Sequence, residues 1–330
     1  INAHLALALD VLSDLIRHPK LDSAEVEKER QVIVEEINQS LDSPQQRVNM
    51  LIDEVIWPDQ ALGRDVAGSK ETVCAFAHES LQSYWASQYG PTNTVISVAG
   101  DVKHEDVESM AQTLFGDWAN TNPSTWFPAE DSQEGPRMML ETRDTEQAHI
   151  CIGLKGVGSE HPDRFIFDVL NVILGEGMSS RLFRELRENK GLVYDVHSYV
   201  SHYFDSGSLT VYAGTGTTHI EAATDAILSE LAQLKQKSVP ESEIAKAKEM
   251  VKGRLVLRME DSRSVSGWIG SQELLIGKIK TIDEIISIVE AITASDLQRV
   301  ANGLFHSKGL SLAIVGPKLN ESRLQSLLVL

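Results

Sequence analysis

The stretch Ile96-Ser97-Val98-Ala99-Gly100 is repeated 216 residues later as Leu312-Ala313-Ile314-Val315-Gly316. Each run is apolar and ends in a glycine, which is typical of a buried strand. Three further stretches match in the same order, at offsets of 215 to 218: residues 4–10 with 219–225, 23–28 with 241–246, and 78–82 with 294–298. These matches predict an internal repeat of about 216 residues. The alternative is that unrelated amphipathic helices resemble one another.

Helix and strand signals occur in both halves of the chain. Apolar residues at helical spacing predict helices over residues 5–16, 79–86, 105–114 and 165–174, and one more after the capping residue Asp22. A β-branched run predicts a strand over residues 94–99, and further strands are predicted over residues 138–141, 149–154, 193–200 and 208–213. The last two form a hairpin, and 138–141 pairs with 149–154. We therefore expect an α+β fold of two structurally similar domains, each a mostly antiparallel sheet covered by helices.

A polar segment separates the two expected domains. Residues 121–136 are rich in proline, serine, threonine and acidic residues and lack periodicity, which predicts a linker. Residues 1–120 would be the C-terminal part of a first domain, and residues 137–330 a complete second domain. Because the second copy begins near Pro136, the repeat predicts that about eighty residues of the first copy precede Ile1.

The composition excludes several classes of protein. With 42% hydrophobic and 24% charged residues, a chain of 330 residues can bury a sizeable core in about two domains. No run of eighteen apolar residues occurs, which excludes a membrane-spanning helix. The net charge of -18 argues against nucleic-acid binding. Cys74 and Cys151 form no metal or disulfide motif, and the compartment stays open between cytoplasm and periplasm.

Two carboxylates, Glu29 and Glu36, are seven residues apart in a predicted helix, and this spacing places them about 20° apart around its axis. Val32 and Ile33 share that face, where a carboxylate needs an ion pair, a hydrogen bond or a metal. An ordinary solvated helix with i,i+4 pairs explains the same pattern. At an offset of 218, Glu36 corresponds to Arg254, so the two copies differ at this position.

The histidines offer no recognisable metal-binding pair. His197 and His202, for example, are five residues apart in a strand-like stretch and would point to opposite faces, so structural or surface roles fit them better. Arg187 and Tyr194 offer hydrogen-bond donors for a peptide carbonyl, a use suited to holding a substrate. A surface ion pair for the arginine and strand packing for the tyrosine are the alternatives.

Six strings occur in a specific order and spacing: residues 27–37 (EKERQVIVEEI), 61–64 (ALGR), 89–93 (YGPTN), 98–102 (VAGDV), 174–183 (LGEGMSSRLF) and 191–194 (GLVY). With these strings the chain resembles the pitrilysin/insulinase family of zinc metallopeptidases, especially the bacterial members that are similar to the mitochondrial processing peptidase. The resemblance covers essentially the whole chain, and it implies a pair of similar α+β domains.

The resemblance also implies a site. Zinc (Zn2+) would be bound by two histidines of a His-x-x-Glu-His motif and by Glu36, with Glu29 as a supporting acid. Arg187 and Tyr194 would hold the substrate and help to polarise its scissile carbonyl. The motif does not occur in this sequence. The family places it in the stretch that the repeat predicts before Ile1, so the chain as printed lacks a complete zinc site.

The expected function is the hydrolysis of peptides or unfolded protein segments by a metal-activated water. The resemblance implies a homodimer in which each site is completed by both subunits. Two alternatives share the fold: a non-catalytic partner or scaffold subunit that binds peptides without hydrolysis, and a purely structural subunit of a larger assembly.

Overall fold

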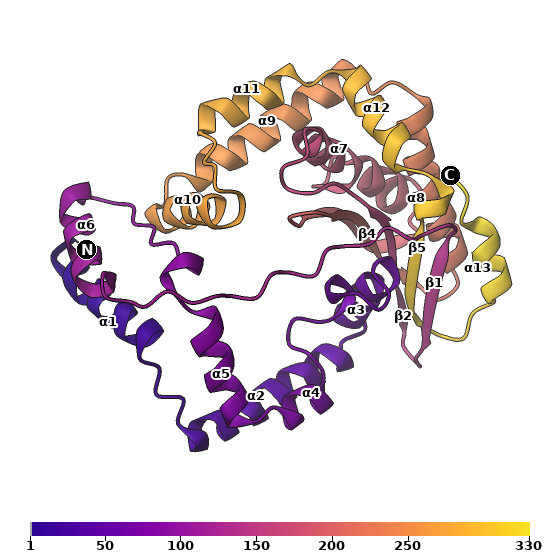
Figure 1. Cartoon of the computed structure of the whole chain (residues 1–330). Helices are drawn as coiled ribbons and strands as arrows, with labels where there is room; N and C mark the ends of the chain where they lie inside the picture. Colours follow the sequence, from indigo (N-terminus) through magenta and orange to yellow (C-terminus); the bar gives the residue numbers. More distant parts are fainter. Residues whose placement is uncertain (1) are drawn as a thin grey trace. The chain divides into compact units, whose positions relative to one another are not determined.

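The computed structural model describes residues 2–330 of the chain (Figure 1). The chain forms two compact units, and each is assembled from stretches that are distant in the sequence. The first comprises the residues up to Ile37 with Ala67–Phe127 and Leu255–Lys280; the second comprises Asn38–Val66, Pro128–Arg254 and Thr281–Leu330. Helices α2 (Ser23–Asp42) and α9 (Glu241–Arg258) therefore contribute residues to both units.

The second unit is built around one mixed sheet with the strand order β1-β5-β2-β4-β3. Its strands are β1 (Arg137–Thr142), β2 (Gln147–Lys155), β3 (Val193–His202), β4 (Gly207–Gly216) and β5 (Ser311–Gly316). β1 and β5 are parallel, and the other three neighbouring pairs are antiparallel. The predicted hairpin of β3 and β4 is confirmed. The predicted pairing of β1 with β2 is wrong, because β5, from the end of the chain, lies between them.

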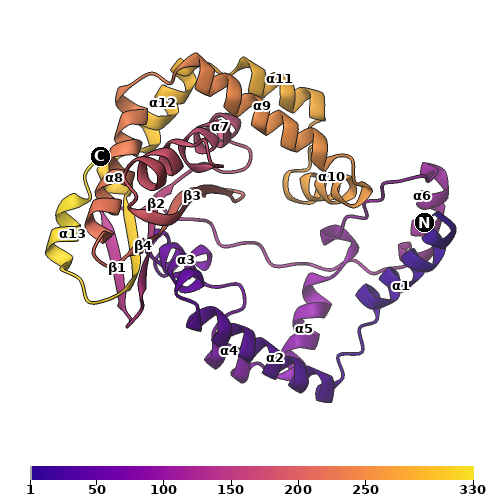
Figure 2. The same cartoon turned by 180° about the vertical axis from the view of Figure 1, so that it is seen from behind.

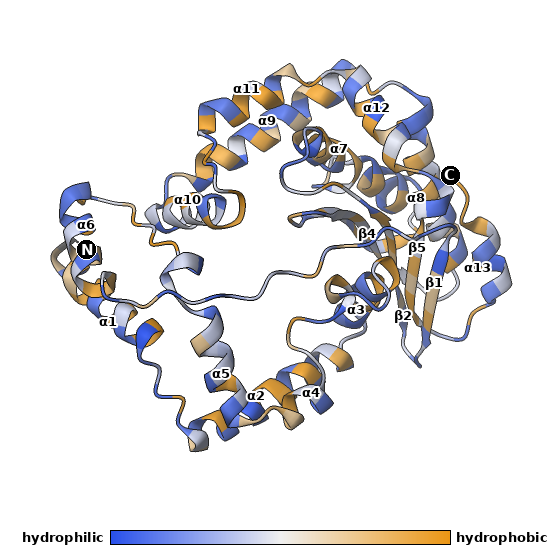
Figure 3. Cartoon of the chain, in the orientation of Figure 1, coloured by the Kyte–Doolittle hydropathy of each residue, from blue (hydrophilic) through white to orange (hydrophobic). Residues whose placement is uncertain are grey.

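Helices cover both faces of this sheet (Figures 1 and 2). On one face, α3 (Pro44–Ile56) inserts Leu51 and Ile52 into a fully buried cluster with Cys151 and Tyr212 of the sheet. On the other face lie α7 (Arg164–Gly175) and α8 (Ile220–Gln236). Strand segments covered on both faces are apolar, as Figure 3 shows for the middle of β2 and for β5.

Three shorter helices complete the second unit: α11 (Ile282–Ala291), α12 (Ala294–Leu304) and α13 (Glu321–Leu327). α12 packs on both α7 and α8, while α11 contacts α7 and α13 contacts α8. The core of this unit therefore has three layers: α3, the sheet, and the helices on its other face.

The first unit consists of helices wherever the structure describes regular elements. Besides part of α2 and the end of α9, they are α1 (Leu5–Arg17), α4 (Lys70–Ala75), α5 (His78–Gln88), α6 (His104–Phe115) and α10 (Ser262–Ile276). Ser13 of α1 donates its hydroxyl to Leu114 O of α6 at 3.3 Å, and Trp85 Nε1 of α5 donates to Ile16 O at 2.9 Å. The helices predicted over residues 5–16, 79–86 and 105–114 are confirmed. Among residues 2–330, no helix is long and apolar enough to cross a membrane.

The predicted strand over residues 94–99 is wrong for the described structure. Thr94 has extended backbone (φ −131°, ψ 134°), but the run is assigned to no sheet. Ser97 instead donates its hydroxyl to Ser266 O in α10 at 2.8 Å. A strand needs a neighbouring backbone to pair with, so β propensity alone does not create one. Residues 2–330 thus contain one sheet where two were expected, and a second repeated domain is not shown.

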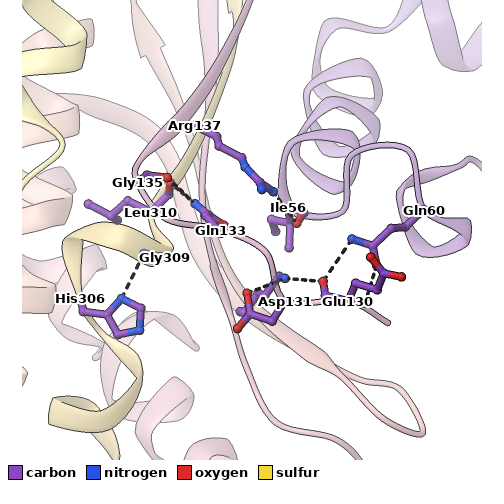
Figure 4. A network of polar contacts seen from close by, with 11 residues as sticks. Ile56, Gln60, Glu130, Asp131, Gln133, Gly135, Arg137, His306, Gly309 and Leu310 are labelled. Carbon is purple, nitrogen blue, oxygen red and sulfur yellow. Dashed lines mark hydrogen bonds and ion pairs between the residues drawn. The ribbon is translucent and has the colours of Figure 1, made fainter. Parts of the chain in front are cut away.

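Residues 128–136 of the predicted linker form no helix or strand, yet side chains attach them to the second unit (Figure 4). Gln60 pairs twice with the backbone of Glu130: its Nε2 donates to Glu130 O at 3.1 Å, and its Oε1 accepts from Glu130 N at 2.7 Å. Farther along, Gln133 Nε2 donates to Leu310 O at 2.9 Å. Hydrogen bonds therefore fix this extended segment to the loop after α3 and to the residue before β5.

Candidate functional site

Arg187 lies in η4 (Phe183–Asn189), a π-helix that leads toward strand β3. Such wide helical turns are rare and are frequent at functional sites. The turn between η4 and β3 is fixed by Gly191, which has a φ of +59°, and by Thr215 Oγ1, which donates to Leu192 O at 2.6 Å. Glycine adopts a positive φ without steric strain. These features hold the end of η4 against the start of β3.

The structure places Arg187 beside Tyr194. The guanidinium carbon of Arg187 lies 5.6 Å from the centroid of the Tyr194 ring and 5.0 Å from that of Phe183. Both distances are within the range of a cation–π contact. Tyr194 is 73% exposed, and the register of β3 with β4 shifts between Val193 and Asp195, at Tyr194 itself. The phenol and the guanidinium therefore form one exposed group of hydrogen-bond donors.

A row of polar and aromatic side chains follows on the sheet face that α3 also covers. His149 Nδ1 lies 2.8 Å from the hydroxyl of the buried Tyr212, and the Tyr212 ring lies 5.0 Å from that of His197. Asp195 Oδ2 is 3.6 Å from His197 Nδ1. Burial raises the pKa of Tyr212 and lowers the pKa of His149, so both are neutral at pH 7.

Sequence reasoning misses this row and also misses Phe183 beneath Arg187. The available signal is the alternation of Asp195, His197 and Tyr199 in β3, which puts polar and aromatic groups on one face of a strand. Phe183 and Arg187 are four residues apart, and no helix is predicted from the sequence for this stretch. Their contact forms in a π-helix that the pattern of apolar residues does not reveal.

The two acids of α2 lie in the first compact unit, whereas Arg187 and Tyr194 lie in the second. Glu29 and Glu36 are both exposed, and within residues 2–330 neither makes a hydrogen bond or an ion pair. Their neighbour Arg30 behaves differently, because it pairs with Glu27 at 2.9 Å and donates to backbone carbonyls near α4. The carboxylates of Glu29 and Glu36 are therefore accessible to a ligand.

The described residues do not by themselves fit a zinc ion. Zinc sites in proteins use at least three side-chain ligands, but residues 2–330 contain no group of three His, Cys, Asp or Glu side chains that could hold a metal. Glu36 could supply only one carboxylate. His202 has a structural role, since its Nε2 lies 3.1 Å from Asp168 Oδ1 and its Nδ1 lies 2.8 Å from Val157 O.

Two family models and a named bacterial protein match this chain in sequence. The family model "Insulinase (Peptidase family M16)" matches residues 1–70, and "Peptidase M16 inactive domain" matches residues 75–251. The chain is 36% identical to the "Uncharacterized zinc protease YmxG" of Bacillus subtilis (strain 168), with 97% of this chain and 77% of that protein covered.

Two solved structures have a similar fold. A protease from Helicobacter pylori matches with a TM-score of 0.89 at 23% identity, over 96% of this chain and 78% of that one. A chain of complex III2 from Candida albicans matches with a TM-score of 0.85 at 19% identity, over 100% of this chain and 81% of that one. At these identities the structural matches establish the fold alone.

Proposed function

This chain belongs to the insulinase family of peptidases, peptidase family M16, and we propose that it is the larger part of a zinc-dependent endopeptidase. Its substrates would be peptides or unfolded protein segments. The observation that carries the proposal is the exposed Arg187–Tyr194 pair in a chain whose relatives are named zinc proteases. The chain spans 77% of the Bacillus relative, so the proposal concerns the protein at its natural length.

In this proposal Arg187 and Tyr194 bind the peptide. The guanidinium of Arg187 offers several donors in a fixed plane, while Tyr194 adds a hydroxyl. Contact with the Phe183 ring restricts the orientation of the guanidinium. Donors aimed at the scissile carbonyl stabilise the negative charge that develops on its oxygen, and losing one typically costs about 10²–10³ in turnover.

Glu36 is proposed as a carboxylate ligand of zinc and Glu29 as a supporting acid. Both side chains are exposed and have no protein partner within residues 2–330, so neither would have to break an ion pair to take these roles. Because the described residues do not hold a metal by themselves, the histidine ligands would come from outside this chain's 330 residues. The isolated chain is not proposed to be active.

We further propose a homodimer with shared sites, in which Glu36 of one subunit works with Arg187 and Tyr194 of the other. The basis of this proposal is the resemblance to the family. We also propose that residues 1–120 are the C-terminal part of a first copy of the repeat and residues 137–330 its second copy, joined by the linker 121–136.

The second candidate function is a non-catalytic subunit that binds peptides without hydrolysis. It is favoured by one specific observation, the match of residues 75–251 to a domain described as inactive. The same donor pair would hold peptides in both cases, so the two functions differ in the metal and in bond cleavage.

Zinc content, peptide binding and hydrolysis measured on the same natural-length protein distinguish the two functions. For the peptidase, we expect Glu36→Gln to reduce bound zinc and hydrolysis with peptide binding retained. Arg187→Ala should weaken peptide binding with zinc retained. The matched controls are Glu35→Gln, an exposed neighbour of Glu36, and Arg184→Ala, an exposed arginine of η4. Binding without zinc or hydrolysis supports the alternative, and the absence of all three contradicts both.

A further inference from the structure

One stripe of helix α9 faces the loop that leads into η4. Glu243, Met250 and Arg254 are separated by seven and then four residues, which places them within about 40° of one another around the helix. Eleven residues of helix separate the first from the last, a distance of about 16 Å along the axis. Three side chains on one stripe can therefore contact a segment that runs beside the helix.

The segment they contact is residues 176–181. Arg181 Nε lies 2.9 Å from Glu243 Oε2, and Glu176 forms an ion pair with Arg254. Gly177, next to Glu176, has a φ of +85°, and a Cβ built there would lie 3.4 Å from Met250 Cε. That distance is an ordinary van der Waals contact, so the loop packs on α9 between the two ion pairs, and it is the positive φ at residue 177 that favours glycine.

The loop is continuous with the candidate site. Arg181 is two residues before Phe183, the first residue of η4 and one of the two rings that contact Arg187. At its other end, the loop begins where α7 ends at Gly175. A Cβ at Gly175 would lie 2.3 Å from Ser198 Oγ, so this end is pressed against β3. Both ends of the loop are thus fixed, and its position sets where η4 begins.

We propose that the Glu176–Arg254 and Arg181–Glu243 ion pairs latch this loop to α9 and thereby hold Arg187 against Tyr194. Glu176, Arg181, Glu243 and Arg254 are positioning residues, because they act on the peptide-binding pair through η4. The proposal rests on the proposed function only for the statement that Arg187 and Tyr194 bind peptides. The latch itself is a property of the chain that can be measured without activity.

The expected size of the effect follows from the exposure of the pairs. The side chains of Arg254 and Glu176 are 49% and 31% exposed, and those of Arg181 and Glu243 are 16% and 35% exposed. Partly exposed ion pairs are screened by water, and their measured contributions correspond to about a two- to fivefold change in an equilibrium constant. We therefore expect each broken pair to weaken peptide binding by about two- to fivefold.

The test uses charge reversal and charge exchange in the full chain. The variants are Glu176→Arg, Arg254→Glu and the double exchange, with a second set at Arg181 and Glu243. Lys252→Glu is the matched control, since it breaks an exposed ion pair between α9 and Glu290 that does not touch the loop. Replacing the six tyrosines with 3-fluorotyrosine gives a ¹⁹F NMR signal for Tyr194, assigned by its loss in Tyr194→Phe. Anisotropy of fluorescein-labelled β-casein, an unfolded protein, measures binding in the presence of a chelator that prevents hydrolysis.

Each single reversal should move the Tyr194 signal and weaken casein binding by about two- to fivefold, with the thermal midpoint unchanged from that of Lys252→Glu. The double exchange should return both readouts toward the original values. An unmoved Tyr194 signal in the single variants, or an equal movement in Lys252→Glu, would overturn the latch. A signal that moves and is restored while casein binding never changes supports the latch and contradicts the peptide-binding role of Arg187 and Tyr194. If a reversal prevents folding, Glu176→Gln and Arg254→Gln provide the same comparison with a smaller change.

Discussion

The hydroxyl of Tyr199 donates a hydrogen bond of 2.9 Å to Oδ1 of Asn49, a residue 150 positions earlier in the chain. The same oxygen accepts a longer contact of 3.5 Å from the thiol of Cys151. Asn49 belongs to α3, while Tyr199 and Cys151 belong to the sheet, so one amide joins the helix to strands β3 and β2. This contact fixes the position of α3 across a fully apolar cluster.

Replacing Asn49 with Leu should destabilise the second unit. The substitution leaves the Tyr199 hydroxyl without its acceptor, and an unsatisfied buried donor costs about 1–3 kcal/mol. Urea unfolding of Asn49→Leu, Tyr199→Phe and the double variant measures the coupling, which we expect to exceed about 0.5 kcal/mol. Tyr84→Phe, at an exposed site on α5, is the control and should be neutral. Simple additivity of the two changes would show that the hydrogen bond contributes nothing.

Gly153 in β2 should not tolerate a side chain. A Cβ at this position would lie 2.6 Å from Ile56 Cδ1 and 3.0 Å from Ile52 Cγ1, both on α3. Gly153→Ala should therefore reduce the free energy of unfolding by about 1–3 kcal/mol through overpacking. The matched control is Gly253→Ala, in the middle of α9 with open space around it, which should raise stability by up to about 1 kcal/mol. Equal effects at both positions would contradict the close packing of α3.

The stability of the second unit should depend on Asp53. Burial, together with the nearby Asp65, raises the pKa of Asp53 from 3.8 to about 6. The folded state therefore binds a proton that the unfolded state releases. For this reason the contribution of Asp53 to the free energy of unfolding falls as the pH rises from about 4 to 6, and it is constant above that range. Asp53→Asn removes this titration. The free energy of unfolding of the variant should therefore exceed that of wild type by an amount that grows from near zero at pH 4 to at most about 3 kcal/mol at pH 7.

Urea unfolding of wild type and Asp53→Asn at a series of pH values checks this prediction. Asp59→Asn, at an exposed position shortly after α3, is the control for other effects of removing a carboxylate. A difference between Asp53→Asn and wild type that stays constant from pH 4 to 7 would contradict the raised pKa.

Mixing two impaired variants of the natural-length protein should restore activity if the sites are shared between subunits. Tyr194→Phe removes a proposed donor and should lower turnover by about 10²–10³, while Glu36→Gln should remove the metal. In a mixed dimer one site carries both changes and the other carries neither, so subunit exchange should yield one intact site per dimer. Hydrolysis of a fluorogenic peptide before and after exchange is the measurement. Heterodimers that form but stay inactive would mean that each chain builds its own site, or that the residues are misassigned.

Local features of the fold were predictable because short-range geometry sets them. α2 begins where Asp22 accepts a hydrogen bond of 2.9 Å from Ala24 N, as its capping position predicts. The β3–β4 hairpin likewise follows from two β-branched runs that are close in sequence. Residues 94–99 show the limit of such reasoning, because their strand propensity has no effect without a backbone to pair with.

In the candidate site, too, some features are visible in the sequence and others require distant residues. Arg187 and Tyr194 are seven residues apart. They were selected from the sequence as hydrogen-bond donors, and the resemblance to a family implied their role in holding the substrate, which stays a prediction. The contact of Arg187 with Phe183 forms in a π-helix, and the ion pairs to α9 join residues that are 62 and 78 positions apart. No local pattern contains that information.

The sequence by itself determined the positions of α1, α2, α5, α6 and α7, the hairpin and the family, because capping, periodicity and ordered motifs act over a few residues. Only the tertiary structure decided that β5 lies between β1 and β2, that α3 covers a sheet made of residues after 136, and that α9 holds the loop before η4. The physical reason is that these arrangements depend on burying distant apolar faces together and on pairing distant charges. Their free energy is gained only when the whole chain is folded.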